Sequence, residues 1–288
     1  MTLCYKSSMK KDGIIVGRTR EGFKRKHIVF GIIGCVIAIT FVGGVFFYPL
    51  YVRYVAGNYA KEFAVVLNSH DMKKYDAFFN EDTVFGNQTP LYFDACLKEL
   101  YPTLKFGATT YLVPKSLFMF PIKLVEFLNE KKVNTICWVV SALTMISAFG
   151  AFKKVVPQYL HTIAFGSEVF PIKQFNIWKS VLPNAKFTNL YGPTECTGMC
   201  CYYKVNREFE ADEVIPIGRP FKNTEIILLT DKNERAQQGE VGEICIRGTS
   251  LTLGYYNNWE KTNEVFVQNP LNKAYPELIY RTGDLGKF

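Results

Sequence analysis

The stretch Asn189-Leu190-Tyr191-Gly192-Pro193-Thr194-Glu195 joins a short apolar run, residues 187–190, to a turn. A Gly-Pro pair interrupts regular backbone structure, so Thr194 and Glu195 are expected on a turn directly after a strand. Ligands of open α/β sheets bind at such strand ends. A hydroxyl and a carboxylate beside an aromatic ring suit a nucleotide phosphate with Mg²⁺. Taken alone, however, the stretch is better explained by a strand followed by a surface turn.

Apolar runs alternate with helix-like segments on the N-terminal side of this stretch. We expect strands at residues 109–113, 135–140 and 162–165, and helices at residues 121–131, 143–155 and 171–181, the last opened by a proline. Strands alternating with helices of this size predict βαβ units and a mainly parallel sheet, and hence an α/β fold.

Beyond Pro220 the pattern changes to strands alone. We expect strands at residues 225–229 and 243–247, joined by a polar turn over residues 231–239. The pattern predicts a small β-barrel or sheet subdomain after the α/β layer. The expected organisation of the chain is a basic arm (1–27), a transmembrane helix (28–52), a membrane-proximal helical segment (53–84), an α/β subdomain (85–219) and the β-rich subdomain (220–288).

The positive charge of the chain is concentrated at its N-terminus. Residues 1–27 carry eight basic and two acidic side chains, so +6 of the formal net charge of +8 lies there. The remainder of the chain is close to neutral, and its composition therefore argues against a nucleic acid as partner.

Residues 28–52 contain no charged side chain. This run exceeds the roughly 20 residues that a helix needs to cross a bilayer. The alternative is a buried core helix, but such a helix is seldom apolar on every face over that length. We therefore predict a membrane span, with Lys24-Arg25-Lys26 as its cytoplasmic anchor.

The eight cysteines are scattered without Cys-x-x-Cys pairs and do not predict a disulfide framework. Cys196, Cys200 and Cys201 stand close together, but no histidine follows nearby to complete a tetrahedral metal site. We expect ordinary reduced thiols.

Four short segments carry a resemblance to a known family. In chain order they are Tyr92-Phe93-Asp94-Ala95, residues 189–195, residues 242–248 with Gly254-Tyr255, and Tyr280-Arg281-Thr282-Gly283-Asp284-Leu285. Together, in this order and at these spacings, they resemble the adenylate-forming ligases. The likeness is greatest to the amino-acid adenylation domains of nonribosomal peptide synthetases and to D-alanine–carrier protein ligases, and it runs from about Phe85 to Phe288.

The resemblance implies a role for individual residues. Asp94 matches the carboxylate that holds the α-ammonium group of the substrate, although it could also be a helix N-cap. Tyr191 matches the aromatic ring that stacks on adenine, Thr194 the hydroxyl that contacts the α-phosphate, and Glu195 the carboxylate that binds Mg²⁺, so Thr194 and Glu195 are the expected catalytic pair. Asp284 matches the residue that accepts hydrogen bonds from the ribose hydroxyls, its alternative being a Gly-Asp turn after a short strand.

The resemblance also implies a pocket. Residues Gly166-Ser167-Glu168 match a tight turn beside the adenine and substrate pockets, where a side chain on Gly166 would crowd a ligand that approaches the backbone. The expected substrate-binding residues are Asp94, Trp138, Phe165, Gly166, Leu190, Gly198 and Met199. The expected nucleotide-binding residues are Gly166, Ser167, Glu168, Asn189, Tyr191, Gly192, Thr194 and Asp284. The mostly apolar pocket suggests a small or medium uncharged substrate side chain.

The reaction implied is the attack of an amino-acid carboxylate on the α-phosphate of ATP. It gives an aminoacyl adenylate, and the acyl group then passes to the phosphopantetheine thiol of a carrier protein. ATP, Mg²⁺ and phosphopantetheine are the expected cofactors, and an amino acid, a carrier protein and the membrane the expected partners.

The sequence departs from the family in two places. The Gly- and Ser/Thr-rich phosphate loop is not found upstream of Asp94, and the chain ends before the C-terminal domain with its lysine. The positive-inside rule also places residues after Val52 outside, whereas adenylation is expected in the cytoplasm. We hypothesise an unrelated membrane-anchored start, residues 1–84, joined to an interrupted adenylation domain that is inactive alone. The alternative is a membrane-anchored, non-catalytic nucleotide-binding or scaffold protein.

Overall fold

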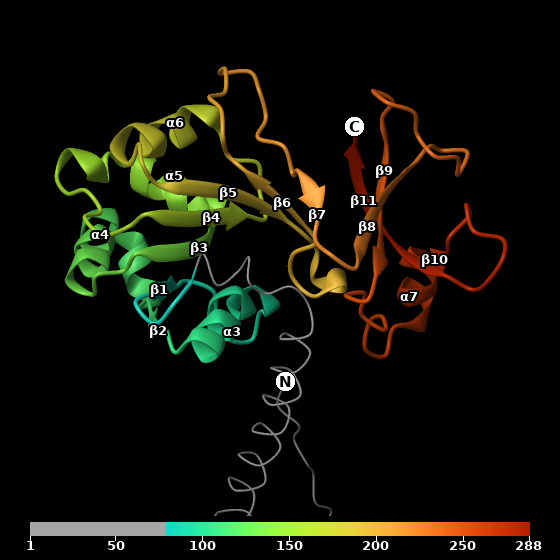
Figure 1. Cartoon of the computed structure of the whole chain (residues 1–288), viewed down its shortest axis with the longest axis horizontal. Coiled ribbons are helices and arrows are strands. Elements are labelled where there is room, and N and C mark those ends of the chain that lie inside the picture. Colours follow the sequence, from blue (N-terminus) through green and yellow to red (C-terminus); the bar gives the residue numbers. More distant parts are fainter. Residues whose placement is uncertain (1–78) are drawn as a thin grey trace, which may run out of the picture. The chain divides into compact units, whose positions relative to one another are not determined.

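The computed structural model describes residues 79–288, which form two β-sheets with helices packed around them (Figure 1). The predicted basic arm, the predicted span at 28–52 and nearly all of the predicted segment 53–84 lie outside the described residues. Within residues 79–288, no helix is long and apolar enough to cross a membrane.

The first sheet is mainly parallel, as predicted. Its strand order is β2-β1-β3-β4-β5-β6-β7, and the pairs from β2 to β5 are parallel whereas β6 and β7 run antiparallel. The strands are β1 (Val84–Asn87), β2 (Thr109–Leu112), β3 (Thr135–Val139), β4 (Thr162–Gly166), β5 (Lys186–Tyr191), β6 (Cys201–Lys204) and β7 (Arg219–Pro220). Strand β3 reads Thr-Ile-Cys-Trp-Val and is buried on both faces, which is typical of a covered parallel strand.

Helices follow the strands in alternation. They are α3 (Leu97–Phe106), preceded without a gap by the 3₁₀ turn η3 (Asp94–Cys96), then α4 (Pro121–Glu130), α5 (Val140–Ala148) and α6 (Ile172–Val181). Apolar side chains of α4, α5 and α6 form one core with those of the sheet, whereas α3 contacts β1, β2 and β3. Short 3₁₀ turns add η4 (Lys115–Met119), η5 (Ala151–Lys153) and η6 (Thr194–Cys196).

The prediction of a helix over residues 143–155 was wrong at both ends. Helix α5 begins at Val140 and ends at Ala148. Gly150 follows in the left-handed conformation with φ 65°, a backbone geometry that ends helices, and only the short η5 continues the segment.

The second sheet is antiparallel, with strand order β10-β11-β9-β8. Its elements are β8 (Thr224–Leu229), β9 (Gly242–Gly248), helix α7 (Trp259–Val265), β10 (Phe266–Gln268) and β11 (Leu278–Gly286). Strands β8 and β10 are its edges and do not pair with each other, so the sheet is open and the predicted barrel is not formed by these strands.

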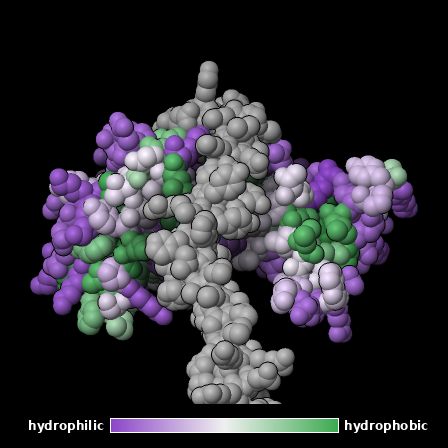
Figure 2. Space-filling model, turned by 90° about the horizontal axis from the view of Figure 1, so that it is seen from below, coloured by the Kyte–Doolittle hydropathy of each residue, from purple (hydrophilic) through white to green (hydrophobic). Residues whose placement is uncertain are grey.

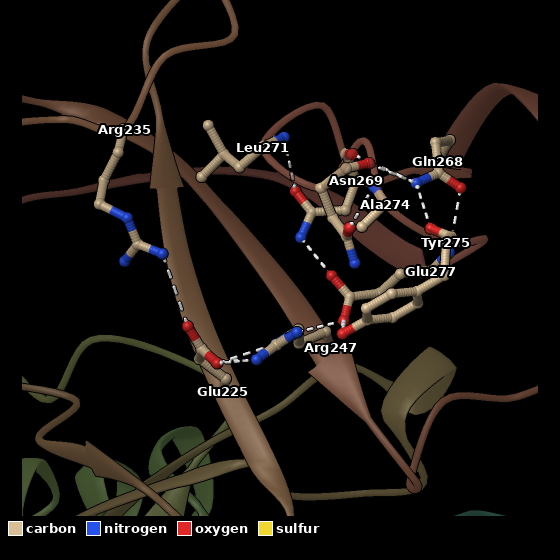
Figure 3. Close-up of polar contacts among 10 residues, drawn as sticks. Glu225, Arg235, Arg247, Gln268, Asn269, Leu271, Ala274, Tyr275 and Glu277 are labelled. Atoms are coloured by element: carbon tan, nitrogen blue, oxygen red, sulfur yellow. Dashed lines mark hydrogen bonds and ion pairs between the residues drawn. The ribbon is translucent and has the colours of Figure 1, made fainter.

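One face of the second sheet carries a ladder of charges (Figure 3). The guanidinium of Arg247 on β9 lies between the carboxylates of Glu225 on β8 and Glu277, and Arg235 approaches Glu225 at 3.6 Å. Glu225, Arg247 and Glu277, with their neighbours, line an open cavity of about 480 Å³ beside the strands. Because every charge in the ladder has an opposite partner, it fastens β8, β9 and the start of β11 to one another.

Hydrophobic side chains gather on part of the face shown in Figure 2. In the loop between β9 and α7, Leu253 is 99% exposed and Tyr256 is 96% exposed, and Trp259 at the start of α7 is 72% exposed.

Candidate active site

The loop that follows β5 forms the centre of the candidate site. It begins where the first sheet changes from parallel to antiparallel pairing, and it returns to the sheet at Cys200, whose N–H donates to Tyr191 O at 2.8 Å. A Cβ added to Gly192 would lie 2.3 Å from Gly198 O and 2.6 Å from Cys200 N. Only glycine allows the loop to close so tightly. Gly192 is thus explained by the loop itself.

Asp94 and Thr194 meet at the mouth of the first sheet, although 100 residues separate them in the chain. The Thr194 hydroxyl donates to Asp94 Oδ1 at 3.4 Å. The other carboxylate oxygen, Oδ2, is buried and has no hydrogen-bond partner. Gly198 lies beside it, since a Cβ added there would be 3.9 Å from Oδ2. A buried carboxylate oxygen without a donor is an unsatisfied acceptor that a cation would stabilise.

The alternative role of Asp94 as a helix N-cap is not what the structure shows. Phe93 occupies the N-cap position of η3, and Cys96 that of α3. Asp94 is instead the first residue of η3, and its carboxylate is free to face the site.

Tyr191 and Asp284 join the two sheets. The phenol of Tyr191, the last residue of β5, donates to Asp284 Oδ2 at 2.6 Å. Asp284 lies at an irregularity in β11 where pairing with β9 shifts between Arg281 and Leu285, next to Gly283 with φ 78°. Such a bulge turns a side chain out of the regular strand alternation. Burial and the adjacent carboxylate together raise the pKa of Tyr191 far above its usual range.

Glu195 is held by groups from the second sheet region. The Tyr255 phenol donates to Glu195 Oε1 at 2.5 Å, and Thr252 N–H donates to the Glu195 carbonyl at 2.8 Å. Burial, followed by the Glu195 carboxylate, raises the pKa of Tyr255. The hydroxyl of Thr197 also donates to Ser250 O at 2.8 Å. These contacts fix the loop that follows β5 against the loop that follows β9.

The described part of the site could hold Mg²⁺ through a single carboxylate, that of Glu195. Among residues 79–288, no three His, Cys, Asp or Glu side chains are grouped to hold a metal ion. Mg²⁺ is commonly held by one or two carboxylates together with substrate phosphates. Glu195 can supply such a carboxylate, with the remaining ligands coming from phosphate and water.

Gly166 is explained by a contact other than the predicted one. A Cβ at Gly166 would lie 2.4 Å from Leu190 O on the adjacent strand β5. The neighbouring backbone therefore excludes a side chain here before any ligand does. Ser167 follows with φ 74°, and both Ser167 and Glu168 are exposed beyond the end of β4.

Two residues predicted to line the substrate pocket belong to the hydrophobic core. Trp138 and Phe165 are each 1% exposed, and the Trp138 indole donates to Gly86 O at 2.6 Å. Phe165 packs edge-on against Phe170, with ring centres 5.0 Å apart. The prediction that Trp138 and Phe165 contact the substrate remains a prediction.

The remaining predicted residues divide between the mouth of the sheet and its interior. Leu190 and Met199 are partly buried and flank the loop with Gly198. Asn189 is 9% exposed, and its amide donates to Pro216 O at 2.9 Å and Ile215 O at 3.3 Å. Those bonds anchor the segment that precedes β7, so the structure gives Asn189 a structural role.

Cys196, Cys200 and Cys201 lie beneath the loop as buried free thiols. They belong to a core cluster that also contains Ile246 and Tyr280 of the second sheet. The cluster therefore packs the base of the loop that follows β5 against both sheets.

The sequence prediction missed two residues of the site region. Tyr255 stands in a motif that contributed to the resemblance, but no role was predicted for it. Glu99 was not considered, yet it is fully buried, and burial raises its pKa to about 7. An acidic side chain five residues after Asp94 was the available signal.

Comparisons with known proteins identify the family of the chain. A match to the family of AMP-binding enzymes covers residues 58–256. The match therefore includes residues 58–84, although the sequence analysis assigned residues 1–84 to an unrelated membrane-anchored start.

Individual relatives show the same likeness over most of this chain. It is 32% identical to tyrocidine synthase 3 of Brevibacillus parabrevis over 83% of its own length and 4% of that protein. It is 28% identical to the D-alanine–D-alanyl carrier protein ligase of Bacillus licheniformis over 82% of this chain and 47% of that protein. The crystal structure of CmiS6 matches with a TM-score of 0.67 and 28% identity, over 75% of this chain and 52% of that one.

The chain thus spans about half the length of the shorter relatives and a small part of the large synthetase. The predicted resemblance to adenylation domains is confirmed. The chain belongs to the family of AMP-binding enzymes and carries part of an adenylation domain like those of nonribosomal peptide synthetases.

Proposed function

We propose that this chain provides the amino-acid and nucleotide sites of an ATP-dependent amino-acid-activating ligase. The observation that supports this most directly is the buried, unpartnered Oδ2 of Asp94. One oxygen of this carboxylate is buried without a donor, and the α-ammonium group of an amino acid would supply a charge and N–H donors together.

The nucleotide would lie along the loop that follows β5. Tyr191 offers a ring for adenine, and the Asp284 carboxylate, 2.6 Å from its hydroxyl, offers acceptors to the ribose hydroxyls. Thr194 is exposed and stands beside Asp94, so its hydroxyl can reach both the α-phosphate and the carboxylate end of the amino acid.

Glu195 would bind Mg²⁺, which neutralises phosphate charge when it is bound. In the reaction, a carboxylate oxygen of the amino acid forms a bond to the α-phosphorus, and the bond from that phosphorus to the bridging oxygen of pyrophosphate breaks. The electron pair leaves with pyrophosphate, and the product is an aminoacyl adenylate. Asp94 contributes by holding the amino group, which positions the attacking carboxylate.

Transfer of the acyl group to a phosphopantetheine thiol of a carrier protein would complete the activity. This step, the carrier protein as partner and a cytoplasmic location of the site are proposed from the family alone. Anchorage through residues 28–52 is proposed from the charge pattern of the sequence.

The experiment is calorimetric titration of the purified chain with AMP and with each of the twenty common amino acids and D-alanine, followed by ATP–pyrophosphate exchange. We expect AMP binding that is lost in Asp284→Ala, and binding of at least one amino acid that is lost in Asp94→Asn. Folding of each variant is checked by circular dichroism. Absence of both AMP and amino-acid binding in the folded chain would refute the proposal.

Nucleotide binding without amino-acid binding or exchange would instead favour the alternative of a non-catalytic nucleotide-binding protein. Exchange by the chain alone would show that the residues present suffice for adenylation.

A further inference from the structure

Glu99 carries a buried carboxyl group for which the proposed reaction has no use. It is 0% exposed on α3. Its Oε2 accepts a hydrogen bond from Asn87 Nδ2 at 2.5 Å, and its Oε1 accepts one from the Cys137 backbone N–H at 3.1 Å. One side chain thus links α3 to the end of β1 and to the middle of β3. Burial of a carboxyl group costs free energy unless the group is hydrogen-bonded, as both oxygens of Glu99 are.

The contact with Cys137 replaces a missing strand pairing. Strands β1 and β3 are paired at Phe85 and Thr135 only, and beyond that point they separate into a fork. Within the fork, polar groups of the backbone are satisfied by side chains instead of by the opposite strand. The Trp138 indole donates to Gly86 O, and Val139 N–H donates to Gln88 Oε1 at 3.4 Å. Glu99 is the member of this set that comes from a helix.

Helix α3 connects the fork to the predicted ammonium acceptor, Asp94, through the chain. Asp94 opens η3, and η3 continues into α3 without an intervening residue, with Leu97 N–H donating to Asp94 O. A group that fixes α3 at Glu99 therefore also fixes the backbone at Asp94, about one and a half helical turns away.

We propose that Glu99 is the positioning residue for Asp94: its carboxyl group ties α3 to the fork between β1 and β3 and so holds the Asp94 carboxylate at the mouth of the sheet. The role of Glu99 in amino-acid binding rests on the function proposed above. Its role in holding α3 to the fork does not depend on that function.

The position has a charge state that can change. Burial raises the pKa of Glu99 to about 7, against the opposing effects of the Asn87 amide, the Cys137 N–H and the nearby Lys98 ammonium. Among residues 79–288, the other titratable groups that face Glu99 are the thiols of Cys96 and Cys137, whose pKa values are raised mainly by burial and which stay neutral near pH 7. Both contacts of Glu99 use it as an acceptor, which suits the ionised form, whereas burial favours the protonated form. A change in the charge of Glu99 near pH 7 should therefore alter its hold on α3, and with it the affinity for the substrate.

The test compares Glu99→Ala, Glu99→Gln and a control, Ser147→Ala, by hydrogen–deuterium exchange of the full chain. Ser147 is also buried, and its hydroxyl bonds Gln174 between α5 and α6, away from the fork. We expect exchange over residues 94–106 to become at least about tenfold faster in Glu99→Ala, as loss of hydrogen bonds to a charged group predicts. Glu99→Gln should restore it, because its amide oxygen can still accept from Cys137.

Unchanged exchange in Glu99→Ala, or an equal increase in Ser147→Ala, would overturn the proposal. If Glu99→Ala does not fold, Glu99→Asp replaces it, because its carboxyl group is one methylene too short to reach the Cys137 N–H. The same outcomes then apply.

A second measurement separates this proposal from the proposed function. For an amino acid that binds the wild-type chain, Glu99→Ala should weaken that binding at least about tenfold while AMP binding changes little, and Glu99→Gln should remove the pH dependence of binding near pH 7. Equal losses for the amino acid and for AMP would contradict a positioning role. If no amino acid binds the wild-type chain, the proposed function fails, while the exchange experiment still decides whether Glu99 holds the helix.

Discussion

The hydroxyl of Tyr191 lies 2.6 Å from Asp284 Oδ2, although 93 residues separate them. One belongs to the parallel sheet and the other to the antiparallel sheet. The two residues proposed for adenine and ribose thus contact each other directly, and the bond holds their side chains at a fixed separation before a nucleotide arrives. A ligand that uses the Asp284 carboxylate must share it with the phenol.

Tyr191→Phe keeps the ring but removes the donor to Asp284. We expect AMP affinity to stay within about threefold of wild type, because the released carboxylate oxygen becomes available to the ribose. Asp284→Ala should lower AMP affinity at least about tenfold, since hydrogen bonds to a charged group contribute about 1.5–3 kcal/mol. Calorimetric titration with AMP measures both. Equal losses in the two variants would show that the phenol, rather than the ring, contributes to binding.

Tyr255→Phe should weaken Mg²⁺ or Mn²⁺ binding in the presence of ATP by about tenfold, because a residue that orients a ligating carboxylate contributes to metal affinity on that scale. The Tyr255 phenol is the group that bonds Glu195 Oε1. Electron paramagnetic resonance of Mn²⁺ measures the change. The matched control is Tyr256→Phe, since Tyr256 is 96% exposed. If both variants bind the metal as wild type does, Tyr255 does not orient the ligand.

Gly166→Ala should destabilise the protein by about 2 kcal/mol or more, because overpacking against backbone cannot be relieved by a rotamer change. The added Cβ would lie 2.4 Å from Leu190 O. Gly286→Ala is the control, because the nearest atoms to its Cβ would be side-chain atoms, of Ile244 at 3.1 and 3.2 Å and of Leu228 at 3.6 Å. Urea denaturation gives the free energy of unfolding of each variant. Similar small losses in both would mean that β4 and β5 can separate at no great cost.

Glu99 should make the protein less stable as the pH rises. Its pKa is raised in the folded chain, from 4.5 to about 7, so the folded state binds the proton more tightly than the unfolded state. The resulting stabilisation is present below pH 4.5 and is lost as the pH rises through about 7, with a magnitude of about 3 kcal/mol. The measurement is the free energy of unfolding of wild type minus that of Glu99→Gln between pH 4.5 and 8. A difference that does not fall over this range would contradict the buried position of the carboxyl group.

Strand β5 was predictable mainly from the Gly-Pro turn that follows it. Strands β3 and β4 were predictable because each is a short, largely apolar run, the pattern of a covered parallel strand. The start of α5 was not predictable from the sequence. Val139 and Val140 are β-branched and favour an extended chain, yet the helix begins at Val140, where burial against the sheet outweighs local preference.

Several features of the site depend on contacts that no local pattern reveals. A glutamate in a helix is expected to face solvent, but Glu99 meets Asn87 and Cys137, which are 12 and 38 residues away. The alternative interpretation of Gly283 and Asp284 was a turn after a short strand, whereas β11 continues through them as an irregular strand. The motif order gave Tyr191, Thr194 and Glu195 as neighbours along the chain, but their separate partners, Asp284, Asp94 and Tyr255, appear only in the fold.

The closed loop after β5 has a consequence for the rate of binding. Because Gly192 lets the chain fold back onto Gly198 and Cys200, the segment loses its conformational entropy when the protein folds, and a ligand does not have to restrict it again. Association should then need no slow rearrangement of this segment and should proceed in a single kinetic phase. A larger residue at position 192 would leave the same chemical groups in place and convert recognition into a search among loop conformations.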